Sequence, residues 1–272
     1  MRWINARPSN GARLSLALLP FILVLAVYMI GSAERLADNA NDKLLPGFSA
    51  LAQTINRMAF VADPRTGDFL LWSDTAASLT RLGLGLGIST AIALLLGLII
   101  GILPYARAFL SPFVGAISKV PPLALLPILF IVMGLGEASK IALIVIGVAP
   151  IMVRDLALTA LSLPREMIVK AETLSASSWQ IALRVVLPQI LPRLITTLRL
   201  QLGPAWLFLI AAEAISSDSG LGYRIFLVRR YLSMDVIFPY VVWITLLAVV
   251  TDILLDRLRI AVFPWSELEK GR

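Results

Sequence analysis

The sequence predicts an all-α polytopic membrane protein with six transmembrane helices. Of its 272 residues 58% are hydrophobic and only 15% are charged, and the mean hydropathy is +0.87. Soluble domains are about 45–50% apolar and 25% charged, so the chain lies well outside their range. The sequence contains no Cys and no His. This absence excludes disulfides, zinc sites built on these residues, and catalysis based on His or Cys.

The first span is expected at residues 14–33, behind a basic leader at residues 1–13 that contains Arg2, Arg7 and Arg13. A signal peptide would share the basic leader. However, the apolar stretch is long and no clear small-residue cleavage site precedes the acidic residues that follow it. We therefore predict an uncleaved anchor. Residues 34–81 are polar and mixed, and we interpret them as an external segment with an amphipathic helix at residues 48–61 and a turn at 63–67.

A five-helix core is expected at residues 82–256, followed by a tail at residues 257–272. Counting apolar stretches against the roughly 20 residues that a span needs places its helices at 82–106, 108–134, 140–158, 194–212 and 236–256. The first of these carries Gly97 and Gly101 at the spacing that permits close helix contact. The second contains Lys119 before Pro121 and Pro122, whose missing amide donors must bend or break the helix.

The longest polar interruption in the second half of the chain is residues 164–192. Pro164 is tolerated in a first helical turn, and Met167, Ala171 and Leu174 share one helical face. The segment is far too short to cross a bilayer. We therefore predict a short amphipathic helix that lies on a surface.

A second helix should follow that short one. Ser177 and Gln180 fit a capping box, which predicts a helix start near Ser178. Pro188 and Pro192 are expected to break this second helix.

The distribution of Lys and Arg predicts the orientation. With the N-terminus inside, the inner segments hold fourteen basic residues against six acidic ones, and the outer segments hold nine against ten. Both termini and the loop at 164–192 are therefore expected in the cytoplasm.

The spacing in this loop resembles the EAA loop of bacterial ABC importer permeases. The pattern falls on Val169, Lys170, Ala171, Ser175, Val185, Leu187 and Pro188. Val169 stands where Glu is usual, Lys170 where Ala is usual and Ser175 where Gly is usual. The resemblance implies a coupling helix that docks on an ATPase subunit through Arg165, Glu166, Lys170, Ala171, Glu172 and Ser175. A generic connector between membrane helices is the alternative.

Further motifs resemble the permeases of the nitrate, sulfonate and taurine importer group. They are the runs at residues 121–127, 134–140, 211–213 and 220–223. The resemblance implies a type I ABC importer permease fold in the bacterial inner membrane. It also implies three kinds of partner: a second permease copy in a homodimer, two ATP-binding subunits, and a periplasmic or extracellular substrate-binding protein.

The class of solute also follows from the resemblance. It implies a small polar solute like nitrate, sulfonate or taurine, and a narrower likeness to permeases associated with urea or guanidine carboxylases adds a urea- or guanidine-like nitrogen compound. The chain lacks a Gly-rich phosphate loop, so we expect it not to be an enzyme, to carry no cofactor, and to leave ATP hydrolysis to a partner. Basic runs with interleaved aromatics are also missing, so no nucleic acid is expected.

Candidate residues for the translocation path are Lys119, Pro121, Pro122 and Glu213. A buried ammonium normally faces a cavity or a partner. Lys119 therefore either lines the path or caps the carbonyls that Pro121 and Pro122 leave free. For Glu213, and for Asp252, the favoured interpretation is solvation at the headgroups near span ends.

Two other functional classes are alternatives. A stand-alone, ion-gradient-driven secondary transporter would predict an internal repeat with two broken helices in corresponding halves, whereas the sequence shows one Pro-rich break. An intramembrane enzyme would need a pair of catalytic residues, and the sequence offers no candidate pair.

Overall fold

The computed structural model describes residues 9–39, 42–64 and 66–268. Arg2, Arg7 and most of the predicted leader lie outside this range, as do the last four residues of the tail. The described residues form helices and contain no strand. By its contacts the chain divides into two compact units: Met1–Phe69 with Val228–Tyr240, and Leu70–Leu227 with Val241–Arg272.

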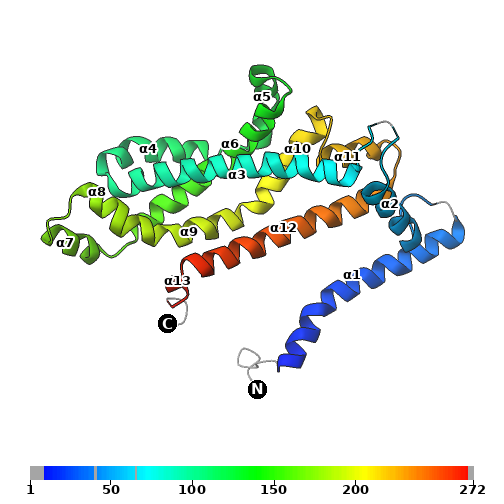
Figure 1. Cartoon of the computed structure of the whole chain (residues 1–272), viewed down its shortest axis with the longest axis horizontal. Coiled ribbons are helices and arrows are strands. Elements are labelled where there is room, and N and C mark those ends of the chain that lie inside the picture. The colour runs from blue at the N-terminus through cyan, green and yellow to red at the C-terminus, as the bar shows by residue number, and fades with distance from the viewer. Residues whose placement is uncertain (1–8, 40–41, 65, 269–272) are drawn as a thin grey trace. The chain divides into compact units, whose positions relative to one another are not determined.

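Six candidate spans are present within the described residues, although two of them, the second and the fifth, differ from the predicted bounds. Five helical segments are long and apolar enough to cross a membrane: α1 (Asn10–Asp38), α3 (Leu70–Ile102), α6 (Glu137–Leu161), the continuous helix Ser178–Leu200, and α12 (Met234–Val262). The sixth is a bent pair, α4 (Pro104–Ile117) followed by Pro122–Met133, whose halves form an angle of 82° (Figure 1). The predicted break at the Pro-rich run is therefore confirmed.

The shorter elements lie between these spans, within the bent span or after the last span. They are α2 (Phe48–Phe60), the 3₁₀ turn η2 (Pro122–Leu125), α5 (Leu126–Met133), α7 (Arg165–Thr173), α10 (Leu202–Ser216), α11 (Leu221–Arg229) and α13 (Trp265–Leu268). The predicted amphipathic helix, α2, and the predicted short surface helix, α7, both form.

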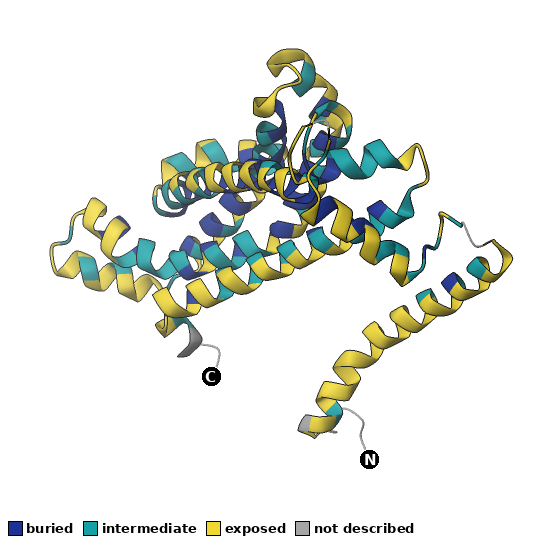
Figure 2. Cartoon of the chain, turned by 45° about the vertical axis from the view of Figure 1, so that its right-hand side comes forward, coloured by how far each residue is buried: buried dark blue, intermediate teal, exposed yellow. Residues whose placement is uncertain are grey.

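Helix α6 is the centre of the second unit, and α3 packs along it. Glycines on α3 make this contact close. A Cβ built on Gly101 would lie 2.4 Å from the Cβ of Ala160, and one built on Gly97 would lie 2.7 Å from the Cβ of Leu156. The glycine spacing read from the sequence thus marks the face of α3 against α6, where buried residues concentrate (Figure 2).

Helix α3 begins at Leu70, well before the predicted start at residue 82. Asp74, Ser78 and Arg81 made this stretch look like a polar loop. They lie at i, i+4 and i+7, on one helical face, and all three are buried in the second unit. Because their polar atoms are bonded inside the protein, the segment can be helical and buried.

Pro188 and Pro192 do not break the helix that contains them. This helix consists of α8 (Ser178–Gln180), a π-helical segment η3 (Ile181–Val186) and α9 (Leu187–Leu200). The wide π turn lets the Leu187 N–H donate to the Ala182 carbonyl, which places Pro188 at the start of α9, where a missing N–H is tolerated. The actual interruption lies at Gln201, between α9 and α10. The predicted span 194–212 is therefore wrong in its bounds.

The first unit is built from α1, α2 and the start of α12. Helix α1 exposes apolar residues along most of its length, Phe21 at 75% among them, as expected for a surface that meets lipid. The Tyr28 hydroxyl donates to the Pro46 carbonyl at 2.6 Å, and the Ser32 hydroxyl donates to the Leu45 carbonyl at 3.0 Å. These bonds fix the loop between α1 and α2.

Candidate functional site

Helix α7 is the predicted coupling segment, and it stands between α6 and α8 on the surface of the second unit. Ile168 and Ala171 are half-buried, so this face lies against the rest of the unit. Met167 is 37% exposed and Leu174 is 76% exposed. An apolar edge of α7 is therefore left uncovered by this chain.

The remaining predicted contact residues lie on the polar surface of the same segment. Arg165, Glu166, Lys170 and Glu172 are all exposed on α7, and Ser175 is exposed just beyond its end. The structure thus gathers the predicted residues on one short element, with Ala171 as the member turned partly inward.

Ser175 ends α7 in a left-handed conformation with φ of 61°. Its N–H donates to the Glu172 carbonyl at 2.9 Å, and the Ala176 N–H donates to the Ala171 carbonyl at 3.0 Å. This is a Schellman motif, whose left-handed position is usually occupied by Gly. Ser175 stands where the EAA pattern has Gly. It retains the same backbone turn, although the left-handed region of φ and ψ disfavours residues that carry a Cβ.

The capping box predicted for the next helix is confirmed. The Gln180 N–H donates to the Ser177 hydroxyl at 3.3 Å, and the Ser177 N–H donates to the Gln180 side-chain oxygen at 2.8 Å. At the base of the loop, Arg193 of α9 pairs with Asp155 of α6 at 2.6 Å, and the Thr197 hydroxyl also donates to Asp155. The two helices that carry α7 are therefore tied to each other.

The broken span carries Lys119 in the turn after α4. The Lys119 backbone N–H donates to the Ala116 carbonyl at 3.1 Å. Its side chain is exposed, and among the described residues it makes no hydrogen bond or ion pair. The capping role is thus absent from this conformation. Pro121 and Pro122 form the bend, and beyond it Ile131 of α5 is 84% exposed.

Glu213 is fully buried, which makes headgroup solvation the wrong interpretation. Its carboxylate accepts from Arg81 at 2.7 Å, from the Ser78 hydroxyl at 2.8 Å and from the Gly222 N–H at 2.8 Å. Arg81 also pairs with Glu137 at 2.5 Å. The cluster therefore joins α3, α6, α10 and the start of α11.

The glycines after α10 make room for this cluster. Gly220 has φ of 121°, and a Cβ there would lie 2.5 Å from an oxygen of Glu213. The Gly220 N–H donates to Asp74 at 3.0 Å, and Asp74 pairs with Arg224 at 2.8 Å. These glycines are thus required by close packing around a buried carboxylate.

Asp252 is likewise paired, with Arg199 at 2.8 Å. The sequence does contain a signal for such pairs. Polar residues such as Asp74, Ser78 and Arg81 recur at helical spacing near a span end, and a polar helical face at that position needs partners.

These features define a class. The described residues form an all-helical, polytopic membrane protein with a broken span and a short surface helix, and they contain no cluster of ligands that could hold a metal ion. Such an arrangement is typical of a component of membrane transport.

The family model of the "Binding-protein-dependent transport system inner membrane component" matches residues 89–264, well over half of the chain, and the chain belongs to this family. It is 35% identical over 215 residues to the taurine transport system permease protein TauC of Escherichia coli K12, covering 78% of each chain. It is 33% identical to the bicarbonate transport system permease protein CmpB of Synechococcus elongatus, covering 57% of this chain and 56% of CmpB. The resemblance predicted from the motifs is thus confirmed.

Solved structures confirm the fold. A chain of a bacterial ABC transporter that imports the acidic polysaccharide alginate matches with a TM-score of 0.63 at 16% identity, covering 92% of this chain and 96% of that one. The alginate transporter has also been solved in complex with its alginate-bound periplasmic protein, with a TM-score of 0.63 at 17% identity.

Proposed function

We propose that this chain is the permease subunit of an ABC importer, forming the solute path and coupling it to separate ATPase subunits. In this proposal two copies form a homodimer in the bacterial inner membrane, with both termini and α7 in the cytoplasm. Two ATPases bind from the inside, and a substrate-binding protein docks from the outside. ATP-driven closure of the ATPases would draw the two α7 helices together and alternate access to the path.

The observation that carries this proposal is α7 itself. A short helix with an uncovered apolar edge, at Met167 and Leu174, ends in a Schellman motif, and the capping box that starts α8 follows directly after it. Burying a leucine side chain stabilises a contact by about 1.5–3 kcal/mol. Helix α7 is thus suited to transmit movement to a partner that covers this edge.

The homodimer is supported by two features of the second unit. Helix α5 exposes Ile128, Ile131 and Val132 by 55–84%, and a Cβ on Gly203 of α10 would meet nothing within 4 Å. An exposed apolar helix and a small residue on an open face both favour close approach by another helix. A second copy would supply that helix and a second coupling helix by symmetry.

The substrate class follows from the relatives' names. Taurine is zwitterionic and bicarbonate is an anion, so we propose a small anionic or zwitterionic solute. The urea- or guanidine-like compound remains the second candidate, since it depends on sequence motifs alone.

The family match counts against the alternative of a stand-alone secondary transporter. That alternative would need two broken helices in corresponding halves, whereas the described residues contain one bent pair, after α4, and at Gln201 only a single residue separates α9 from α10. An experiment on the partners tests the choice directly.

That experiment is the isolation of the native assembly. The chain is expressed with two different tags and purified in mild detergent through both tags in sequence. We expect a complex that contains both tagged copies of the permease. Native mass spectrometry should show as many ATP-binding subunits as permease copies. A single copy without an ATPase, active in vesicles under an ion gradient alone, would establish the secondary transporter instead.

Lys119 is proposed to line the path, because its ammonium is exposed beside the bend and bonds to no described residue. Replacing Lys119 by Met should lower ATP-driven uptake by about tenfold or more, as expected when one charge contact of about 1.4 kcal/mol is lost. Radiolabelled taurine is the first probe, and co-purification of the ATPase is the control for assembly. Uptake at the wild-type rate would remove Lys119 from the path.

A further inference from the structure

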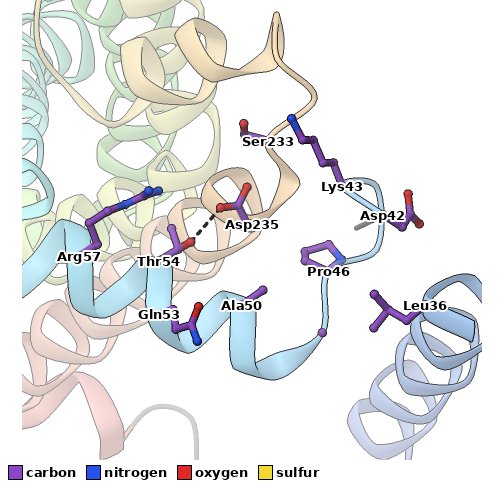
Figure 3. A pocket seen from close by; sticks show the side chains of 11 residues that line it. Leu36, Asp42, Lys43, Pro46, Ala50, Gln53, Thr54, Arg57, Ser233 and Asp235 are labelled. Carbon is purple, nitrogen blue, oxygen red and sulfur yellow. Dashed lines mark hydrogen bonds between the residues drawn. The ribbon is translucent and has the colours of Figure 1, made fainter. Parts of the chain in front are cut away.

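A polar cavity of about 850 Å³ lies in the first unit, between the loop before α2, the helix α2 and the start of α12 (Figure 3). The polar side chains of its wall are those of Asp42, Lys43, Gln53, Thr54, Arg57, Ser233 and Asp235. All of these residues belong to the same compact unit. The cavity therefore does not depend on how the two units are arranged.

Two cations in this wall are left without partners. Neither the Lys43 ammonium nor the Arg57 guanidinium forms an ion pair or a side-chain hydrogen bond with any described residue. Asp235 accepts a hydrogen bond from the neutral Thr54 hydroxyl at 2.8 Å. The other lining carboxylate, Asp42, is paired with Arg35 at 2.5 Å, and this bond lowers its pKa. The free charge of the cavity is thus two cations against one carboxylate.

The walls are preformed rather than loose. The loop that carries Lys43 is fixed to α1 by the hydrogen bonds of Tyr28 and Ser32. Helix α2 is fixed to the start of α12 by the bond from Thr54 to Asp235. A partner would therefore meet charges that are already positioned, which lowers the entropic cost of binding.

The cavity and the apolar surface of α2 lie on opposite faces of that helix. Phe48, Ala52 and Ile55 are exposed and share one face at i, i+4 and i+7. The lining residues Ala50 and Arg57 project from the other side. If the apolar face lies against the membrane, as in interfacial helices, the cavity opens toward water. An occupant from the aqueous side is thus favoured over a lipid headgroup.

We propose that this cavity receives acidic side chains of the external substrate-binding protein, an inference that rests on the proposed function. Its volume is within the range of pockets that enclose drug-sized ligands, about 300–1,000 Å³. A solute with the few atoms of bicarbonate would leave it mostly empty, whereas a protein loop with two carboxylates would match Lys43 and Arg57 and fill the space.

The experiment measures docking in nanodiscs. The complex is reconstituted with its ATPase, and ATP hydrolysis is followed while the purified binding protein that stimulates the wild type is titrated. We expect the double variant Lys43→Glu with Arg57→Glu to raise the concentration for half-maximal stimulation by about tenfold or more, since close charge pairs across interfaces contribute to affinity. Asn56→Glu adds a negative charge one residue away, outside the cavity lining, and should leave that concentration unchanged. Reversing one acidic residue of the binding protein to Lys should restore docking to the double variant.

The outcomes separate this inference from the proposed function. If no binding protein stimulates the wild-type complex, the proposed function fails. If the wild type and the double variant respond at the same concentration, only the docking inference is overturned. It is also overturned if removing anionic lipid from the nanodisc raises the half-maximal concentration of the wild type to that of the double variant, because the occupant would then be a headgroup. Equal losses in Asn56→Glu would mean that general surface charge is responsible.

Discussion

Replacing Leu174 by Asp is expected to weaken binding of the ATPase by about tenfold or more and to abolish ATP-driven uptake. The side chain is 76% exposed, so the substitution removes little packing within this chain. Covering a leucine stabilises a contact by about 1.5–3 kcal/mol, and a buried carboxylate opposes it further. Co-purification of the ATPase with the variant, compared with the wild type, measures the effect.

Thr173→Asp is the matched control, because it adds the same charge to the exposed neighbouring position on another face of α7. We expect a smaller loss in this variant. Equal losses in both variants would show that charge alone matters, and wild-type binding in Leu174→Asp would show that α7 is not the contact.

Replacing Glu213 by Ala should produce the largest loss of stability among single substitutions in the charge cluster. The carboxylate is fully buried and neutralises Arg81, which is itself 5% exposed. Removing one partner of a buried pair costs about 3–5 kcal/mol, and Arg81 would keep only its pair with the 58% exposed side chain of Glu137, which water screens. For a protein of this size, the loss corresponds to a Tm about 10 °C lower in a thermal-unfolding scan of the purified permease.

Two further variants test the mechanism of this loss. Glu137→Gln should cost less, because the Glu137 side chain is 58% exposed and its pairs are screened by water. The double variant Arg81→Met with Glu213→Leu should recover much of the stability that Glu213→Ala loses, since replacing both charges removes the buried cation that has lost its buried partner. If Glu213→Ala melts within 2 °C or so of the wild type, the cluster does not hold the helices together.

Periodicity and local chemistry were sufficient to predict most of the fold. Apolar stretches of about the right length identified the spans, and the glycine spacing at Gly97 and Gly101 identified a close helix contact, that of α3 with α6. The capping box at Ser177 was predicted because both of its partners are local in sequence. The short helix α7 was predicted for the same reason.

The errors arose where tertiary contacts override local signals. Asp74, Ser78 and Arg81 look like loop residues until Glu213, far away in the sequence, is placed beside them. Pro188 breaks an α-helix by local rules, but a π turn upstream accommodates it. One sequence does not reveal which distant residues will pair, nor where a helix will shift its hydrogen-bonding pattern.

Within the candidate site, the sequence predicted the location of α7 but not its exposed edge. Which of Met167, Ala171 and Leu174 faces the rest of the chain depends on how α7 is anchored, and the anchoring uses the left-handed turn at Ser175. The proposed role of Lys43 and Arg57, which pair with no described residue, was also not predictable, because most charged surface residues are simply solvated.

Helix α7 is proposed as the cytoplasmic contact for an ATPase, and site-directed cross-linking tests this proposal most directly. The chain contains no natural Cys, so Leu174→Cys introduces a single reactive thiol. With a short bismaleimide and an ATPase that carries one Cys in its permease-facing groove, we predict a cross-linked product of this chain and the ATPase, whereas Ile131→Cys in α5 should give none. Labelling of Leu174→Cys by a membrane-impermeant maleimide added outside intact cells, without a cross-link to the ATPase, would contradict the claim.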